Sequence, residues 1–95
     1  MTKNQRELIF NQLRKYRKAR GLKQSEAARI LGFADSSSIS KWERGIRLPN
    51  TTQLFRLAAL YRVLVDALFI DVLRTIRDEI RSLEADVLRP DRYDA

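Results

Sequence analysis

Apolar side chains recur at helical spacing along most of the 95-residue chain, and no segment alternates apolar with polar residues as a strand does. The pattern predicts an all-α protein with five helices. The first helix is expected from about Lys3 to Ala19, with Ile9 and Leu13 on its apolar face. The others are expected at about 24–31, at 36–44, from 51, and from 65 or 66 in a run that can continue unbroken to about 88.

Residues that start and stop helices divide these segments. Thr2 can cap the first helix and Asp35 the third, because short polar side chains accept hydrogen bonds from free backbone N–H groups. Gly32 and Gly45 follow the second and third helices, where a left-handed residue often ends a helix. Residues 49–51, Pro-Asn-Thr, open the fourth helix.

The apolar residues of the last helix form a stripe with steps of four and three, which is the a/d spacing of a coiled coil. The members of this stripe, called the seam below, are Phe69, Leu73, Ile76, Ile80, Leu83 and Val87. About 18 residues beyond position 70 span roughly 27 Å as a helix, which is longer than one small domain needs. The seam predicts a dimerisation helix; the alternative is a helix packed against its own domain.

Positive charge is concentrated in the first two thirds of the chain. The whole chain carries a net charge of +7. Residues 1–62 hold 14 Lys and Arg against 4 Asp and Glu, a net charge of +10, whereas residues 63–95 hold 5 against 8, a net charge of −3. So strong a field favours a polyanionic partner, nucleic acid first. An acidic protein and an anionic membrane surface are the alternatives.

Composition excludes several kinds of chemistry. The chain has neither cysteine nor histidine, so it has no disulfide, no zinc–thiolate site and no histidine base. We therefore expect no enzyme, no metal site and no cofactor. The first ten residues lack the apolar core of a signal peptide. Arg62, Asp66 and Asp71 interrupt the most apolar window, 57–73, so a cytoplasmic protein without a membrane span is expected.

Two of the expected helices, 24–31 and 36–44, are short and meet at a tight turn. The second of them has an apolar side, Ile39 and Trp42, and a polar side that begins with small serines. Small polar side chains at the start of a helix allow it to approach a base edge closely. This geometry is that of a helix-turn-helix, whose second helix enters the major groove with its N-terminal end.

The ordered set Gln24-x3-Ala28-x3-Gly32, then Ile39-Ser40-x-Trp42-Glu43-x-Gly45, then Pro49, resembles the Cro and phage-repressor-like helix-turn-helix family, also called the xenobiotic-response-element family. The resemblance covers roughly residues 8–69. It implies a five-helix, repressor-like DNA-binding domain over residues 1–70. Residues 71–95 would then form a helical extension for dimerisation and a short tail.

The resemblance also implies roles for individual residues. Arg17 is expected to pair with Glu43 across the first and third helices; the alternative is a solvated surface arginine. The expected base contacts are Ser36, Ser37, Ser40 and Lys41, and a lysine at that position suits guanine O6 or N7. The expected phosphate contacts are Lys23, Gln24, Arg44 and Arg47. For the serines, the alternative is simply their preference for helix starts.

The sequence departs from the family pattern in three places. The turn from Gly32 to Asp35 is one residue longer than usual, which can shift the serine assignments by one position. Arg62 stands where glycine often ends the fourth helix, and Leu64 where a capping serine is common. These two replacements blur the break, so that the fourth and fifth helices could join in a bend.

These observations predict a homodimeric repressor that reads a palindromic operator in double-stranded DNA through the third helix. The dimer interface is expected along the seam. The alternative is an antitoxin or anti-activator type of protein, whose acidic C-terminal helix binds a second protein. The two functions can coexist in one chain.

Overall fold

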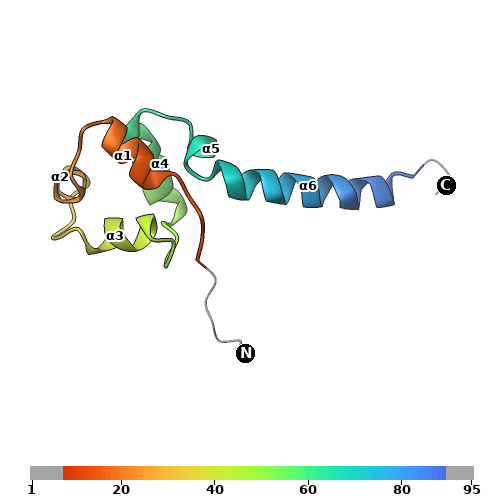
Figure 1. The fold of residues 1–95 in the computed structure, drawn as a ribbon, viewed down its shortest axis with the longest axis horizontal. Coiled ribbons are helices and arrows are strands. Elements are labelled where there is room, and N and C mark those ends of the chain that lie inside the picture. The colour runs from red at the N-terminus through yellow and green to blue at the C-terminus, as the bar shows by residue number, and fades with distance from the viewer. Residues whose placement is uncertain (1–7, 90–95) are drawn as a thin grey trace, which may run out of the picture.

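The computed structural model describes residues 8–89. Within this range the chain forms α-helices joined by turns and loops, and it contains no strand. Five short helices form a globular head, and a long sixth helix projects from it (Figure 1). The helices are α1 Leu13–Ala19, α2 Gln24–Ile30, α3 Ser37–Glu43, α4 Thr51–Tyr61, α5 Val65–Leu68 and α6 Ile70–Val87. The expected all-α, repressor-like fold is confirmed.

Four of the helices supply the largest fully buried side chains of the core. Leu13 of α1, Ile39 of α3, Leu57 of α4 and Leu68 of α5 are the largest fully buried side chains. The buried Ala27 and Ala28 on α2 let that helix approach α3 closely. Such close contact leaves little room for larger side chains, because protein interiors are packed at crystal-like density.

The first helix begins ten residues later than expected, at Leu13. Residues 8–12 are not helical, and Thr2 and Lys3 lie outside the described residues. Asn11 explains the late start: its Oδ1 accepts from the N–H of Leu13, and its Nδ2 donates to the carbonyls of Ile9 and Trp42. These bonds give the segment before α1 fixed partners outside any helix, and Phe10 remains largely exposed.

Gly45 lets that segment lie directly on the end of α3. The N–H of Ile9 donates to the carbonyl of Gly45 at 2.9 Å. Gly45 has a φ of +75°, and a Cβ added there would collide with the backbone of Ile9, including its nitrogen at 2.7 Å. The position therefore needs glycine twice, for its backbone conformation and for the space.

Helices α4 and α5 are separate, so the expectation that they could join in a bend is wrong. Asn50 caps α4 by accepting the N–H of Gln53. At the other end Arg62 adopts the left-handed conformation, with φ 62°, that glycine usually supplies. The N–H of Val63 then donates to the carbonyl of Ala58 and closes the helix end.

The expected unbroken fifth helix is also wrong, because a break at Phe69 divides it into α5 and α6. The carbonyl of Leu68 accepts the N–H of Gln12 rather than an N–H four residues further along its own chain. The side chain of Gln12 also donates to Asp71 at 2.9 Å. These contacts seat α5 on the start of α1 and turn α6 away from the head.

No residue of α6 is buried. Its seam faces the head only near Leu73 and Ile76, and the rest of the helix stands clear of the head (Figure 1). The alternative of a helix packed along its own domain therefore does not hold beyond the first two turns. No helix within residues 8–89 is long and apolar enough to cross a membrane.

The two glycines that follow α2 and α3 offer a matched pair of substitutions. Gly32 has a φ of +83° but open space around it, so Gly32→Ala should cost only backbone strain, about 1–2 kcal/mol. Gly45→Ala should cost this strain plus about 1–3 kcal/mol for the collision with Ile9. Urea denaturation gives both free energies of unfolding. Equal losses would show that the segment before α1 is not held against Gly45.

Candidate nucleic-acid interface

Helices α2 and α3 are joined by a turn that contributes to the core. Gly32 follows α2 with a positive φ, and the N–H of Phe33 donates to the carbonyl of Ala28 at 2.9 Å. The ring of Phe33 then packs edge-on against Trp42, with 5.7 Å between centroids. The turn therefore fixes the position of α3 through an aromatic contact, and the serines that begin α3 start from a defined place.

The N-terminal end of α3 is organised by Asp35. Its Oδ1 accepts from both the backbone N–H and the hydroxyl of Ser37, at 2.9 and 2.7 Å. These two bonds, with a smaller contribution from the charge of Lys41, lower the pKa of Asp35 below its ordinary value. An ionised carboxylate can only accept, so the single hydroxyl proton of Ser37 is committed to Asp35. Ser37 is left with lone pairs alone to offer a ligand.

The other expected base contacts lie along the same helix. Ser36 immediately precedes α3 and is half-buried, and Lys41 lies one turn beyond Ser37 and is also half-buried. Ser40 accepts a hydrogen bond from Nε of Arg44 at 3.2 Å, which leaves its own hydroxyl proton available. The structure therefore brings the four expected base-reading residues together, on the first turns of one helix.

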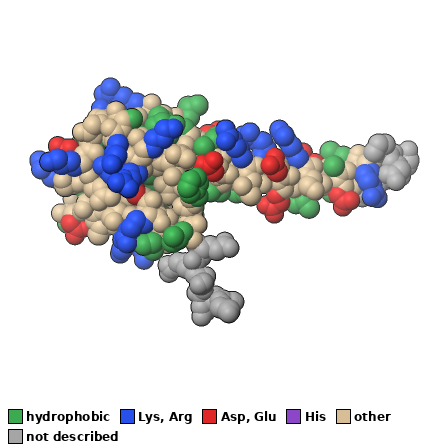
Figure 2. All heavy atoms as spheres, viewed as in Figure 1, with side chains coloured by type: hydrophobic (Ala, Val, Ile, Leu, Met, Phe, Trp, Pro, Cys, Tyr) green, Lys and Arg blue, Asp and Glu red, His purple; other side chains and the backbone are tan. Residues whose placement is uncertain are grey.

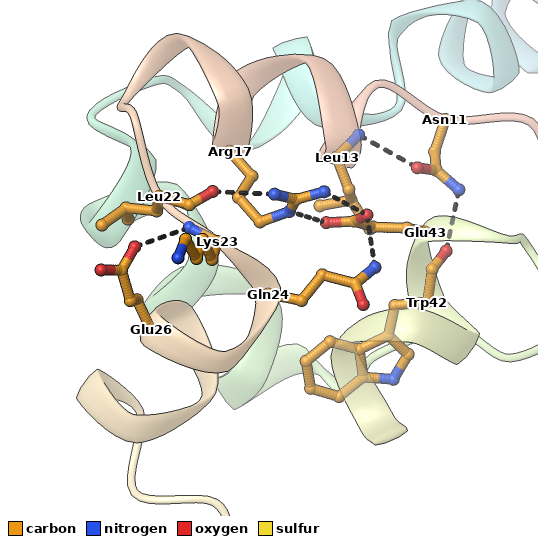
Figure 3. A network of polar contacts seen from close by, with 9 residues as sticks. All are labelled: Asn11, Leu13, Arg17, Leu22, Lys23, Gln24, Glu26, Trp42 and Glu43. Atoms are coloured by element: carbon orange, nitrogen blue, oxygen red, sulfur yellow. Dashed lines mark hydrogen bonds and ion pairs between the residues drawn. The ribbon is translucent and has the colours of Figure 1, made fainter. Parts of the chain in front are cut away.

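Arg17 and Glu43 form a buried ion pair between α1 and α3 (Figure 3). Nε of Arg17 lies 2.6 Å from Oε2 of Glu43, and Nη2 lies 3.1 Å from Oε1. Nη1 donates to the carbonyl of Leu22, between α1 and α2. The carboxylate raises the pKa of Arg17, and the side chains are only 8% and 4% exposed. Arg17 is therefore not a solvated surface residue.

Gln24, an expected phosphate contact, also belongs to this network. Its Nε2 donates to Oε1 of Glu43 at 3.0 Å, so the first residue of α2 is tied to α3 (Figure 3). A side-chain amide has two N–H donors, and Glu43 takes one of them. Only the second is available to a phosphate.

A polar hollow of about 430 Å³ lies where α1, α2 and α3 meet. Gln24, Ser40 and Arg44 line it together with the ion pair and Arg14. Arg14 is exposed and was missed by sequence reasoning. Its position one turn before Arg17 on the same helix was the available signal. The remaining expected phosphate contacts, Lys23 and Arg47, are exposed at the start of α2 and in the loop after α3.

The hydroxyl of Tyr61 lies buried near the same network without a hydrogen-bond partner in the described part of the chain. Burial first, and the charge of Glu43 second, raise the pKa of Tyr61 to about 12. The neutral phenol is the form that this interior tolerates. Residues 8–89 contain no cluster of acidic side chains that could hold a metal ion.

Removing one member of the ion pair should be far worse than removing both. Glu43→Ala leaves the guanidinium of Arg17 buried without its counter-charge, which should cost about 3–5 kcal/mol of unfolding free energy. The double variant Arg17→Met with Glu43→Leu removes both charges and should lose less than Glu43→Ala alone. Thermal and urea denaturation provide the measurement. A loss in the double variant that equals or exceeds the loss in Glu43→Ala would contradict a coupled pair.

Comparison with protein families matches residues 13–68, more than half of the chain, to a family described as helix-turn-helix. No curated protein and no solved structure gave a significant match. The matched region begins with α1 and ends with α5, so it contains the ion pair, the α2–α3 turn and the polar end of α3. The chain belongs to the Cro/C1-type helix-turn-helix family of DNA-binding transcription regulators.

Proposed function

We propose that the protein is a homodimeric repressor that binds a palindromic operator, with α3 of each copy in the major groove. The observation that carries the proposal is the polar start of α3, where Ser37 is exposed, together with exposed basic side chains on α1, at the start of α2 and after α3. Figure 2 shows Lys and Arg side chains spread over the head. Such a protein acts where the operator DNA is, which in our proposal is the cytoplasm.

The base contacts differ in the bonds that they can make. Lys41 offers only donors and suits O6 or N7 of guanine. The hydroxyl of Ser37 donates its hydrogen bond to Asp35, so Ser37 can only accept from a base, through N4 of cytosine or N6 of adenine. Ser36 and Ser40 complete the reading set. The four residues would therefore read a site of mixed character in each half of the operator.

The phosphate contacts would flank this reading set. Lys23 and Gln24 lie at the start of α2, and Arg44 and Arg47 lie at and after the end of α3. Arg14 joins them from α1, beside the polar hollow that Gln24 and Arg44 share. Their charges position the protein on DNA without reading sequence.

The seam supplies the dimer contact. One helix-turn-helix touches few base pairs, and two copies on half-sites about 34 Å apart match one turn of DNA. Ile76, Ile80, Leu83 and Val87 are between 46% and 61% exposed in one chain. A parallel pair would place Glu79 near Glu84 of the other copy. An antiparallel pair that crosses near Ile80 would place Arg77 near Glu84 instead, so we favour the antiparallel arrangement.

The alternative function is that of an antitoxin or anti-activator, in which α6 holds a second protein. The acidic balance of residues 63–95 is the observation that favours it. Stable co-purification of another protein, together with weak DNA binding by the isolated chain, would support this alternative over a repressor.

Selection of bound duplexes from a random DNA pool should yield a palindrome, and variants should then separate its readers from its phosphate contacts. Lys41→Ala should relax preference at one base pair per half-site, by about 1–3 kcal/mol. Arg47→Ala is the matched control: it should weaken binding to all sequences alike and flatten the log–log salt dependence by roughly one unit. A Lys41→Ala profile equal to that of the unchanged protein would remove α3 from the reading role.

Charges placed in the seam should separate the copies without unfolding the head, because α6 has no buried residue. Ile80→Asp with Leu83→Asp should give a folded monomer whose operator affinity collapses while its helical circular dichroism survives. Sedimentation at tens of micromolar measures the assembly, and an exposed control change such as Thr75→Asp, off the seam, should leave the dimer intact. A monomeric unchanged protein would overturn the homodimer.

A further inference from the structure

An apolar groove opens where α6 leaves the head. It has a volume of about 420 Å³. Leu48 and Pro49 of the loop after α3, Leu54 of α4 and Val65 of α5 form one side, and Leu73 and Ile76 of α6 form the other. Hydrophobic side chains reach the surface at this junction (Figure 2). The groove is lined by no residue of α2 or α3 and by none of the residues proposed to contact DNA.

The groove is continuous with the seam, because Leu73 and Ile76 belong to both. Further along α6, a second apolar hollow of about 280 Å³ is lined by Ile80, Leu83, Val87 and Leu88. Leu88 is 73% exposed. One chain therefore presents an apolar groove at one end of α6 and exposed apolar side chains at the other.

These two ends are complementary in an antiparallel pair. Val87 lies seven residues after Ile80 and Leu73 seven residues before it, so a crossing at Ile80 sets them opposite each other. Leu88 falls opposite Val72, which also lines the groove. Arg89 of the partner subunit falls opposite Asp71, so the charges beyond the apolar residues are opposite as well.

We propose that the groove of each head receives Val87 and Leu88 of a second copy. This inference rests on the proposed homodimer and names a surface of the head as part of its interface. The same chain cannot fill its own groove, because Leu88 stands about 22 Å along the helix from Leu73. Two-fold symmetry fills both grooves at once.

Filling the groove would enlarge a contact that the helices alone leave small. Specific interfaces bury about 1,200–2,000 Å² in total, and a single pair of 18-residue helices offers only a narrow stripe. The groove also contacts the elements that carry α3. Leu48 follows Arg47, and Ile9, another lining residue, is hydrogen-bonded to Gly45 at the end of α3. The end of the partner's helix would therefore steady the head that reads DNA.

Cysteine cross-linking tests the inference directly, because the chain contains no cysteine of its own. A tagged Leu48→Cys chain mixed with an untagged Leu88→Cys chain should form a mixed cross-linked pair with a short bismaleimide. The matched control is tagged Ile30→Cys with Leu88→Cys. Ile30 is as exposed as Leu48, at 58% against 55%, but lies on α2 at the far side of the head (Figure 1).

Ile80→Cys separates the outcomes, because it should cross-link to itself in any dimer that crosses at Ile80. Self-linking of Ile80→Cys, with no more mixed product for Leu48→Cys than for the control, would overturn the groove and leave the homodimer standing. A monomer in sedimentation would overturn both. Operator binding is measured separately, so failure of the DNA-binding proposal is distinguished from failure of the groove contact and from failure of the homodimer.

A second measurement uses charge in place of cysteine. Leu48→Glu places a carboxylate in the groove and should raise the dimer dissociation constant at least tenfold in sedimentation. Ile30→Glu, on α2, should leave that constant unchanged. Circular dichroism verifies that both variants are folded. An unchanged constant for folded Leu48→Glu would overturn the inference.

Discussion

The guanidinium of Arg17 lies between three helices, and the geometry of the DNA-reading end depends on how it is satisfied. It meets the carboxylate of Glu43 on α3 and the carbonyl of Leu22 before α2, while Gln24 of α2 bonds to the same carboxylate. A buried charge is costly unless it is paired, so this network has few alternative arrangements. The network therefore fixes the angles between α1, α2 and α3 more than it adds to the free energy of unfolding.

The fold was largely predictable because its determinants are local. Gly45, the Ala28–Gly32 spacing and Asn50 each impose a backbone or packing requirement that can be read from residue type. The two wrong expectations about helix boundaries have a common cause. Asn11, Gln12 and Leu68 have hydrogen-bond partners far away in sequence, so neither the late start of α1 nor the break before α6 leaves a signal in periodicity.

The charge of the head was a good guide to its partner but a poor guide to individual residues. Arg17, Arg20 and Arg56 donate to the carbonyls of Leu22, Leu60 and Leu31, so these arginines hold the head together. The exposed Arg14 lies at the polar hollow instead. Residue type and spacing do not separate these two roles of arginine; the family resemblance did so for Arg17 alone.

Because α6 projects from the head, its length would set the distance between the two heads of a dimer. Eleven residues separate Phe69 from Ile80, so a crossing at Ile80 would hold the two head junctions roughly 33 Å apart. That is close to one turn of DNA, about 34 Å. Only whole heptads can be added or removed without rotating the seam out of register. Removing one heptad before the crossing would shorten the separation by roughly 21 Å, more than half a turn, and carry one head to the other face of the duplex. The length of α6 and the pitch of DNA would thus constrain each other.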